Sequence, residues 1–385
     1  MASPLKNKLQ IIFLVAACWL LTAPSYAQPT EHVRVAIMKD AASVSIKING
    51  FFQILDAGGK IVLYRGKNLK TTVTAYRGGI LMGGRNFNSN KILVSTYGSD
   101  VIIINGRLFR GSIQFIKEGS SGLLVTNHIG LEDYIKGIMY HEASHYWPME
   151  ALQAQAIVCR TYAIYSCQQN KPKDYDVTSD IYSQVYGGMT SERYRTNQAV
   201  EKTHGLILTY RNNVIPAYYH ATCAGHTEDA SLLWNIDIAP LKGKPCGFCK
   251  DAPHFNWHYV VSSGEIKEKL QDAGYLISNI EKIMILGRDK SGRITELKII
   301  SGKKDLKVSA KDFRNIIGPN IIKSTNFKVK IIKDDIVFEG FGWGHGVGLC
   351  QWGAYFMAKQ GYNAKQILQY YYPGTQLTPY EINRF

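Results

Sequence analysis

The pattern of hydrophobic and polar positions changes after residue 125, from alternation to helical spacing, and strands return later in the chain. Between residues 33 and 125, short β-branched runs often alternate apolar and polar positions, which is typical of strands with one buried face. These runs are residues 33–37, 44–48, 60–64, 91–95 and 101–104. Turn dipeptides punctuate them at Asn49-Gly50, Gly58-Gly59, Gly83-Gly84 and Asn105-Gly106. We therefore predict a β-rich N-terminal region over residues 28–125.

Helical spacing follows this region. Pro148 precedes a run rich in Ala, Leu, Gln and Glu at residues 149–165, and proline is favoured at the start of a helix. Further helices are predicted at residues 131–138, 192–203, 263–272, 310–317, 352–360 and 364–370, with strands at 206–220 and 280–308. We predict an α+β protein in which one helix-centred domain spans residues 126–380.

The first 27 residues have the composition of a secretory signal peptide. Lys6 and Lys8 precede an apolar run over residues 9–22, and Ser25-Tyr26-Ala27 has small residues where a signal peptidase cuts. Two alternatives are an uncut anchor, although the run is shorter than the ~20 residues that span a bilayer, and a lipoprotein signal ending at Cys18. We predict cleavage after Ala27 and export to the periplasm or cell wall of a bacterium, with no transmembrane segment afterwards.

The net charge narrows the choice of partners. The formal charge is +15. An exported protein rarely meets nucleic acid, so we expect anionic polymers or peptide carboxylates of the cell wall as partners, and no nucleic acid.

One five-residue motif matches a known zinc-peptidase pattern. His141-Glu142-Ala143-Ser144-His145 is an H-E-x-x-H sequence, in which two histidines one helical turn apart bind zinc and the glutamate activates a water. Pro148, three residues after His145, would end such a helix. A glutamate that could be the third ligand is missing between Glu150 and Glu192. A zinc peptidase is therefore a remote alternative.

Several blocks around and beyond this motif occur together in one known family. They are Leu131-Glu132-Asp133-Tyr134-Ile135-Lys136-Gly137-Ile138, Trp147-Pro148-Met149-Glu150-Ala151, Arg160-Thr161-Tyr162-Ala163, Ser183-Gln184-Val185-Tyr186-Gly187-Gly188, Gly342-Trp343-Gly344-His345-Gly346-Val347-Gly348, Gln351-Trp352-Gly353-Ala354 and Tyr371-Tyr372-Pro373-Gly374-Thr375. In this order and spacing, residues 131–377 resemble the stage II sporulation protein D (SpoIID)/LytB family. The β-rich region matches it only loosely.

The resemblance implies a protein that acts on peptidoglycan glycan strands. The best-understood members of the family are lytic transglycosylases, and the family's catalytic glutamate corresponds to Glu142. Such a lyase cleaves the MurNAc–GlcNAc bond and forms 1,6-anhydro-MurNAc with one carboxyl as sole acid and base, whereas ordinary glycoside hydrolysis needs two. The carboxyl must be protonated near neutral pH, so we expect an apolar surround from Tyr140, Tyr146 and Trp147. The alternatives are a solvated Glu142 at a helix end and, from the family, a non-catalytic enhancer of an amidase.

Further substrate-binding residues are expected near the glycine-rich segment 342–348. Glycines let a ligand approach the backbone closely, so His345 within this segment could bind substrate or steady Glu142. The alternative is a packed histidine in a tight turn. The remaining candidates for contacts with sugars are Gln184, Tyr186, Trp147 and Gln351.

Three of the six cysteines that follow residue 27 have the spacing of metal ligands. His220 and Cys223 are separated by two residues, and so are Cys246 and Cys249. Two such pairs are typical of a structural zinc site, which would fix the loop 220–249. A disulfide is the alternative, and His226 is a second candidate ligand. We expect no cofactor for catalysis, and we assign Cys159, Cys167 and Cys350 to the core or to a disulfide.

Overall fold

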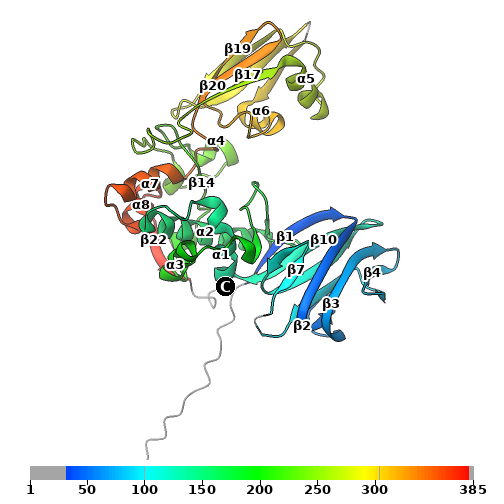
Figure 1. Ribbon diagram of the computed structural model, residues 1–385. Coiled ribbons are helices and arrows are strands. Elements are labelled where there is room, and N and C mark those ends of the chain that lie inside the picture. Colours follow the sequence, from blue (N-terminus) through cyan, green and yellow to red (C-terminus); the bar gives the residue numbers. More distant parts are fainter. Residues whose placement is uncertain (1–31, 99, 303, 381–385) are drawn as a thin grey trace, which may run out of the picture.

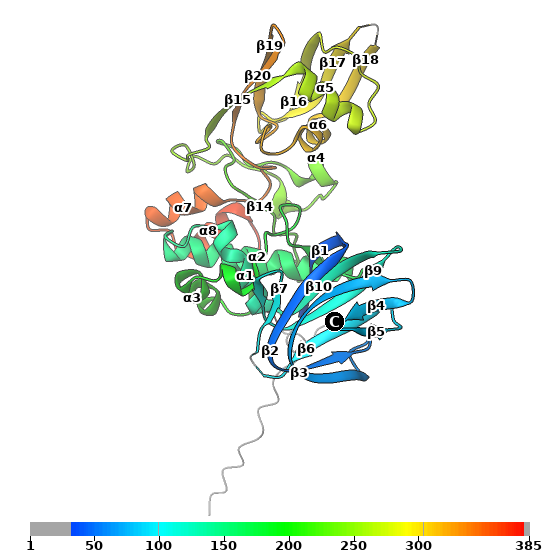
Figure 2. The ribbon, with the colours of Figure 1, turned by 45° about the vertical axis from the view of Figure 1, so that its right-hand side comes forward.

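The computed structural model describes residues 32–98, 100–302 and 304–380. The chain has three parts: an N-terminal sheet, a helical part, and an upper unit formed by residues 256–341 (Figure 1). The helical part lies between the other two in the turned view as well (Figure 2). The signal peptide predicted at residues 1–27 lies outside the described residues. Within the described ranges, helices are too short or too polar to cross a bilayer.

The alternating N-terminal segments pair into one eleven-stranded sheet. Its order is β11-β1-β10-β9-β6-β2-β3-β4-β5, with β7 paired to β2 and β8 to β7. In β2, Val44, Ile46 and Ile48 are fully buried while the residues between them are exposed. The strands are β1 (His32–Ala41), β2 (Ser43–Leu55), β3 (Val62–Tyr76), β4 (Gly79–Met82), β5 (Arg85–Phe87), β6 (Lys91–Thr96), β7 (Ile102–Ile104), β8 (Arg107–Phe109), β9 (Ser112–Glu118), β10 (Gly122–Gly130) and β11 (Val177–Thr178).

One of the four predicted turns is wrong. Asn49-Gly50 lies inside β2, where the pairing with β3 shifts between Ile48 and Phe51. The shift is a β-bulge, and Gly50 there has a φ of 121°. The dipeptide therefore has the backbone freedom of a turn but bends a continuous strand. The other three dipeptides do form turns, among them Asn105-Gly106 between β7 and β8.

The helical part is built around α2 (Met149–Asn170). Leu152 and Ala156 pack into the core shared with the sheet, whereas Ala154, Ile157 and Val158 pack into a second core with the C-terminal helices. The predicted α+β class, with a β-rich N-terminal region, is confirmed. The other elements of this part are α1 (Leu131–Glu142), η1 (Gly188–Ser191), α3 (Tyr194–Lys202), β12 (Leu206–Tyr210), β13 (Asn213–Val214), β14 (Tyr219–His220), α4 (Ala230–Trp234), η2 (Ala239–Leu241), β21 (Leu349–Cys350), α7 (Gln351–Lys359), α8 (Ala364–Tyr371) and β22 (Gln376–Pro379).

The upper unit has a hydrophobic core of its own, around Trp257, Phe313 and Phe338. Its two antiparallel sheets have the orders β15-β20-β19 and β16-β17-β18. Both helices begin where predicted, because Ser262 and Ser309 cap their N-termini. This unit lies within the single domain predicted at residues 126–380. Its elements are β15 (Asn256–Ser262), α5 (Ser263–Asp272), β16 (Lys282–Arg288), β17 (Ile294–Ser301), β18 (Lys304–Ser309), α6 (Ala310–Ile317), β19 (Phe327–Ile332) and β20 (Asp335–Phe341).

Candidate active site

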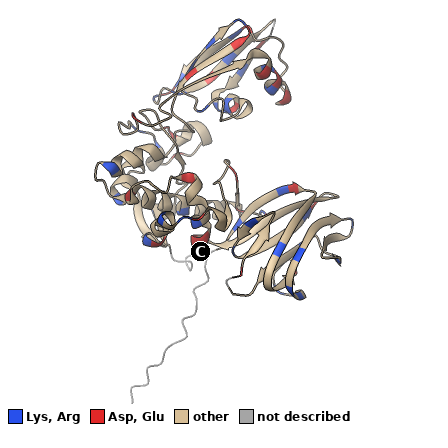
Figure 3. Cartoon of the chain, viewed as in Figure 1, with Lys and Arg blue, Asp and Glu red and all other residues tan. Residues whose placement is uncertain are grey.

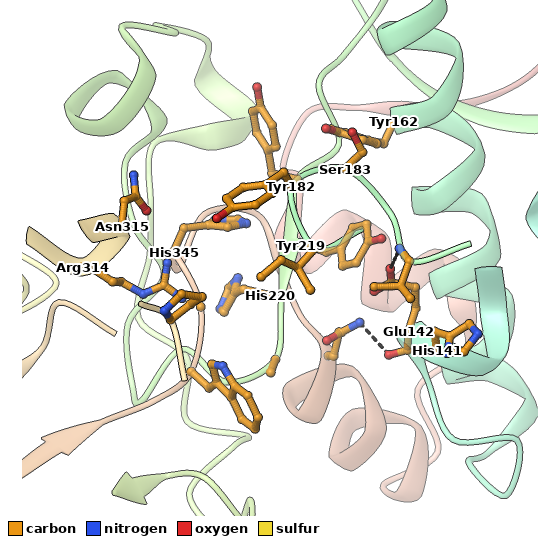
Figure 4. A pocket seen from close by; sticks show the side chains of 18 of the residues that line it. His141, Glu142, Tyr162, Tyr182, Ser183, Tyr219, His220, Arg314, Asn315 and His345 are labelled. Atoms are coloured by element: carbon orange, nitrogen blue, oxygen red, sulfur yellow. Dashed lines mark hydrogen bonds between the residues drawn. The ribbon is translucent and has the colours of Figure 1, made fainter. Parts of the chain in front are cut away.

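A pocket of about 420 Å³ has walls from both the helical part and the upper unit. The helical part contributes the end of α1, the loop 181–185, β14 and the glycine-rich segment 342–348, and the upper unit contributes the end of α6 and the loop after it. Figure 4 shows Glu142 on one side of the pocket, and Arg314 and His345 on the opposite side. The aromatic residues of the lining are Tyr162, Tyr182, Tyr218, Tyr219, Trp234 and Trp343.

Glu142 is the last residue of α1, and its carboxyl faces the pocket. The backbone N–H of Val185 donates to Oε1 at 3.3 Å, and the side chain of Tyr219 also hydrogen-bonds to the carboxyl. Burial raises the pKa of Glu142 to about 7, although these hydrogen bonds act in the opposite direction. Among the described residues that line the pocket, Glu142 is the one carboxylic acid. Near neutral pH it can both give and accept a proton.

The H-E-x-x-H motif does not have the geometry of a zinc peptidase. The helix α1 ends at Glu142, because Ala143 has an extended backbone with φ −144° and ψ 138°. His145 therefore lies beyond the helix, and His141 Nε2 is 2.6 Å from the hydroxyl of Ser191. The cluster of potential metal ligands found among the described residues contains neither histidine. The helix thus ends before the second histidine, well ahead of Pro148.

Two of the five predicted substrate-binding residues line the pocket. Gln351 Nε2 donates to the backbone carbonyl of Glu142 at 2.8 Å, so this side chain holds the end of α1. His345 packs edge-on against Trp234, with ring centroids 5.0 Å apart, and its Nδ1 accepts from the backbone N–H of Val347 at 3.1 Å. Burial and nearby positive groups lower the pKa of His345 well below its usual value, so its ring is neutral at neutral pH.

Gln184, Tyr186 and Trp147, the other three residues predicted to bind substrate, are not part of the pocket lining. Gln184 is fully buried behind the wall, where its Nε2 donates to the hydroxyl of Tyr219 at 3.2 Å. The Tyr186 hydroxyl donates to Asn127 at 2.7 Å in the core, and Trp147 packs against aromatic residues of α7. Gln184 thus supports a residue of the pocket wall, whereas Tyr186 and Trp147 belong to the core packing.

The aromatic surround of Glu142 differs from the one expected. Tyr140 and Tyr146 do not line the pocket, and 81% of Tyr146 is exposed. Tyr162 from α2 and Tyr219 from β14 take this role. The pattern at residues 206–220 predicts a strand but does not indicate which of its tyrosines faces Glu142.

The glycine-rich segment lies directly on β14. Its four glycines have φ between 71° and 107°, which L side chains rarely adopt. A Cβ on Gly348 would lie 2.0 Å from the carbonyl oxygen of Tyr218, and a Cβ on Gly344 would lie 2.7 Å from the Cβ of His220. The glycines therefore allow β21 to pair in parallel with β14, which brings Gln351 and Tyr219 to the same residue, Glu142.

Two families of known proteins match parts of the chain. The family described as Stage II sporulation protein (SpoIID) matches residues 119–210, and a Domain of unknown function (DUF8618) matches residues 244–348. A Bacillus subtilis protein named Stage II sporulation protein D is 31% identical over 266 residues, which cover 65% of this chain and 75% of the relative. The chain belongs to the SpoIID family.

Two further relatives extend this result. An uncharacterised protein of Brachyspira hyodysenteriae is 37% identical over 284 residues, covering 73% of this chain and 75% of the relative. A Bacillus subtilis protein named Amidase enhancer is 28% identical over 345 residues, covering 76% of this chain and 47% of that relative. The predicted family is confirmed, and it supports a role related to the cell wall. The SpoIID match contains Glu142 and the loop 181–185, whereas Arg314 falls in the DUF8618 match.

Arg314 is a site residue that the sequence analysis missed. Lysines and arginines occur in all three parts of this SpoIID-family protein (Figure 3), but of those that the structure describes Arg314 alone lines the pocket. Its Nε donates to the carbonyl of Lys323 at 3.3 Å. Burial and the nearby Arg293 lower the pKa of Arg314 to about 10, so the guanidinium stays charged at neutral pH.

The predicted metal site differs from the observed cluster in one residue. His220 lies outside the cluster: its Nδ1 is 3.1 Å from the carbonyl oxygen of Val347, and its buried Nε2 has no hydrogen-bond partner among the described residues. Burial lowers the pKa of His220 to about 3, and its ring lines the pocket. The fourth position belongs to a cysteine, and the sulfur atoms of the cluster all lie within 4.8 Å of one another: Cys223, Cys246, Cys249 and Cys350.

Proposed function

We propose that this SpoIID-family protein is a peptidoglycan lytic transglycosylase with Glu142 as its sole acid and base. The single carboxyl of the pocket, with its pKa raised to about 7, is the observation that carries the proposal. Ordinary glycoside hydrolysis uses two carboxyls beside the scissile bond. In the transglycosylase reaction, the C6 oxygen of MurNAc replaces the glycosidic oxygen on C1 of the same sugar. A single group that first gives and then takes a proton is enough for this. Because peptidoglycan lies outside the cell membrane, this function requires the export predicted from residues 1–27.

The reaction consumes no water. Glu142 protonates the oxygen that joins MurNAc C1 to GlcNAc, and the bond from C1 to this oxygen breaks, which releases the GlcNAc end as an alcohol. The hydroxyl on C6 of the same MurNAc then attacks the electron-poor C1. As the new C–O bond forms, the Glu142 carboxylate takes the hydroxyl proton and returns to its acid form. The product is a 1,6-anhydro-MurNAc end.

The surroundings of Glu142 suit this cycle. The N–H of Val185 and the hydroxyl of Tyr219 hold the carboxyl in one orientation while it changes its charge. The neutral rings of His220 and His345 do not compete with it as acids. The aromatic side chains of the lining offer faces on which sugar rings can stack.

The rate of glycan-strand cleavage is expected to fall as the pH rises. Glu142 has to carry a proton when the substrate binds, and its pKa is about 7. Above that pH the protonated fraction falls about tenfold per unit, and kcat/KM is expected to fall with it. The measurement is kcat/KM for glycan strands at a series of pH values on both sides of neutrality. A rate that rises through neutral pH would mean that the essential group acts in its deprotonated form, which contradicts this role for Glu142.

Arg314 is the group proposed to bind a carboxylate of the substrate, such as that of the MurNAc lactyl group or a stem peptide. A guanidinium–carboxylate hydrogen bond contributes more than a neutral one, so Arg314→Gln is expected to raise KM about tenfold or more. Strands whose carboxyls have been reduced to alcohols should show no such difference between the two proteins. The control is Lys328→Gln, which removes the same charge from an exposed position of the upper unit. Equal KM values for Arg314→Gln and the unaltered protein on native strands would contradict this role.

A second candidate function is enhancement of an amidase without catalysis, which the relative named Amidase enhancer favours. The two candidates differ in what the protein does alone. Purified sacculi are incubated with the protein, with an amidase, and with both. A transglycosylase releases glycan fragments by itself. Release of stem peptides that is accelerated only in the mixture, with glycan strands left intact, would favour the enhancer and contradict the enzyme.

A further inference from the structure

We propose that Cys223, Cys246, Cys249 and Cys350 bind one zinc ion, in a closed structural site that joins three distant segments of the chain beside the pocket. The four sulfur atoms lie within 4.8 Å of one another, and all four side chains are buried. A tetrahedral zinc site with Zn–S bonds of ~2.3 Å has sulfur atoms about 3.8 Å apart. The cluster therefore already has the size of such a site, and Cys223 and Cys249 approach to 3.3 Å.

The segments that carry the sulfur atoms come from different parts of the chain. Cys223 follows β14, Cys246 and Cys249 lie in a loop without helix or strand, and Cys350 precedes α7. The loop 220–249 is long for irregular structure, with only the short α4 and η2 inside it. Four thiols in a shared buried site provide what a zinc ion needs, since it prefers thiolates and closes structural sites with four protein ligands.

Backbone N–H groups around the cluster already hydrogen-bond to sulfur. The N–H groups of Cys223 and Gly353 donate to Cys350 Sγ at 3.3 and 3.4 Å. Cys350 is also the N-cap residue of α7. Hydrogen-bond donors of this kind orient the ligand atoms of a metal site, and Cys350 is the ligand that the sequence spacing did not indicate.

The site lies directly behind the pocket wall. Cys350 precedes Gln351, which holds the backbone of Glu142, and its strand β21 pairs with β14, which carries Tyr219. A zinc ion bound to Cys223 and Cys350 would fix the ends of both strands relative to each other. Metal binding is independent of the proposed function, whereas any effect on catalysis rests on it.

The first test is metal content. The purified protein, produced in zinc-containing medium, is expected to hold about one zinc per chain by elemental analysis. Replacement by cobalt(II) in the unaltered protein should give intense thiolate-to-cobalt absorption and the visible bands of a tetrahedral ion, without the need for any variant. Absence of bound metal, iron in place of zinc, or cobalt spectra without thiolate bands would overturn the proposal. So would a mass spectrum that shows disulfides among the four cysteines of freshly isolated protein.

Variants test the ligand set. Cys350→Ser is expected to lower zinc affinity at least tenfold, whereas His220→Ala and Cys167→Ala should keep about one zinc per chain. Loss of zinc in His220→Ala, with retention in Cys350→Ser, would restore the ligand set predicted from the sequence and overturn this one. If Cys350→Ser does not fold, hydrogen exchange of the unaltered protein decides. Chelation of zinc should then accelerate exchange at residues 219–226 and 349–353 but not in the N-terminal sheet, and equal exchange with and without zinc would contradict the site.

Discussion

Replacing Glu142 with glutamine is expected to lower kcat for glycan-strand cleavage by a factor of about 10² to 10⁴, the usual range for a general acid or base. Glutamine has nearly the same shape and can still accept the hydrogen bond from Val185, but it cannot release or take up the proton. KM should change little, because the lining that binds sugars is untouched. The measurement is the initial rate of release of soluble glycan fragments, with the fold checked by circular dichroism.

The matched control is Glu268→Gln, on the exposed face of α5 in the upper unit. It removes the same charge from the same chain, so it should leave the rate and the pH profile unchanged. If Glu142→Gln keeps the rate of the unaltered protein while folding normally, Glu142 is not the acid and base, and the proposed mechanism fails.

Replacing Arg160 with methionine is expected to destabilise the protein by about 3–5 kcal/mol, the usual loss when one partner of a buried ion pair is removed. Arg160 lies on α2 and is fully buried. Its Nε and one amino nitrogen donate to the two oxygens of Glu132 on α1, both at 2.7 Å, and it also donates to the carbonyls of Val200 and Leu206. Methionine fills part of the space but leaves the carboxylate and both carbonyls without this donor.

The measurement is the urea concentration at the midpoint of unfolding of the helical part, recorded by near-ultraviolet circular dichroism. A surface pair provides the control. Glu201, with 62% of its side chain exposed, is 3.2 Å from Lys136, and exposed pairs contribute about 0–1 kcal/mol. Glu201→Gln should therefore move the midpoint far less than Arg160→Met. Equal shifts for the two variants would contradict the view that the pair between Arg160 and Glu132 holds α1, and with it Glu142, against α2.

Much of the fold could be predicted because local signals agree with the tertiary structure. Ser262, Ser309 and Pro148 mark helix starts, and all three are followed by the helices expected. Asn49-Gly50 shows the limit of such signals, because a glycine with positive φ suits a bulge as well as a turn. The separate core of the upper unit was missed, since alternating strands and short helices look alike whether they join one core or two.

The site was predictable where a residue type and its neighbours define the chemistry. Glu142 was found through the blocks around it, and Pro148 predicted that α1 could not carry a zinc-binding histidine pair. The sequence could not show which way single side chains face, so Gln184 and Tyr186 were expected to contact sugars although both are buried and outside the pocket lining.

Site residues that lie far apart in the sequence could not be predicted, for a related reason. Close spacing in the sequence indicates pairs such as Cys246 and Cys249. The fourth cysteine, Cys350, lies on a segment that follows the upper unit in the chain and packs back against the other three. Arg314 reaches the pocket in the same way, because α6 belongs to the upper unit while Glu142 belongs to the helical part. Neither could be placed without the tertiary structure.

The most direct test of the central claim is the mass of the cleavage products formed in water labelled with heavy oxygen. If Glu142 directs the C6 hydroxyl onto C1, every new MurNAc end is a 1,6-anhydro end, lighter than a hydrolysed end by one water, and it contains no heavy oxygen. A reducing MurNAc end that carries one heavy oxygen would show that water attacks C1. That result would contradict the account of Glu142 as the lone acid and base of a lytic transglycosylase.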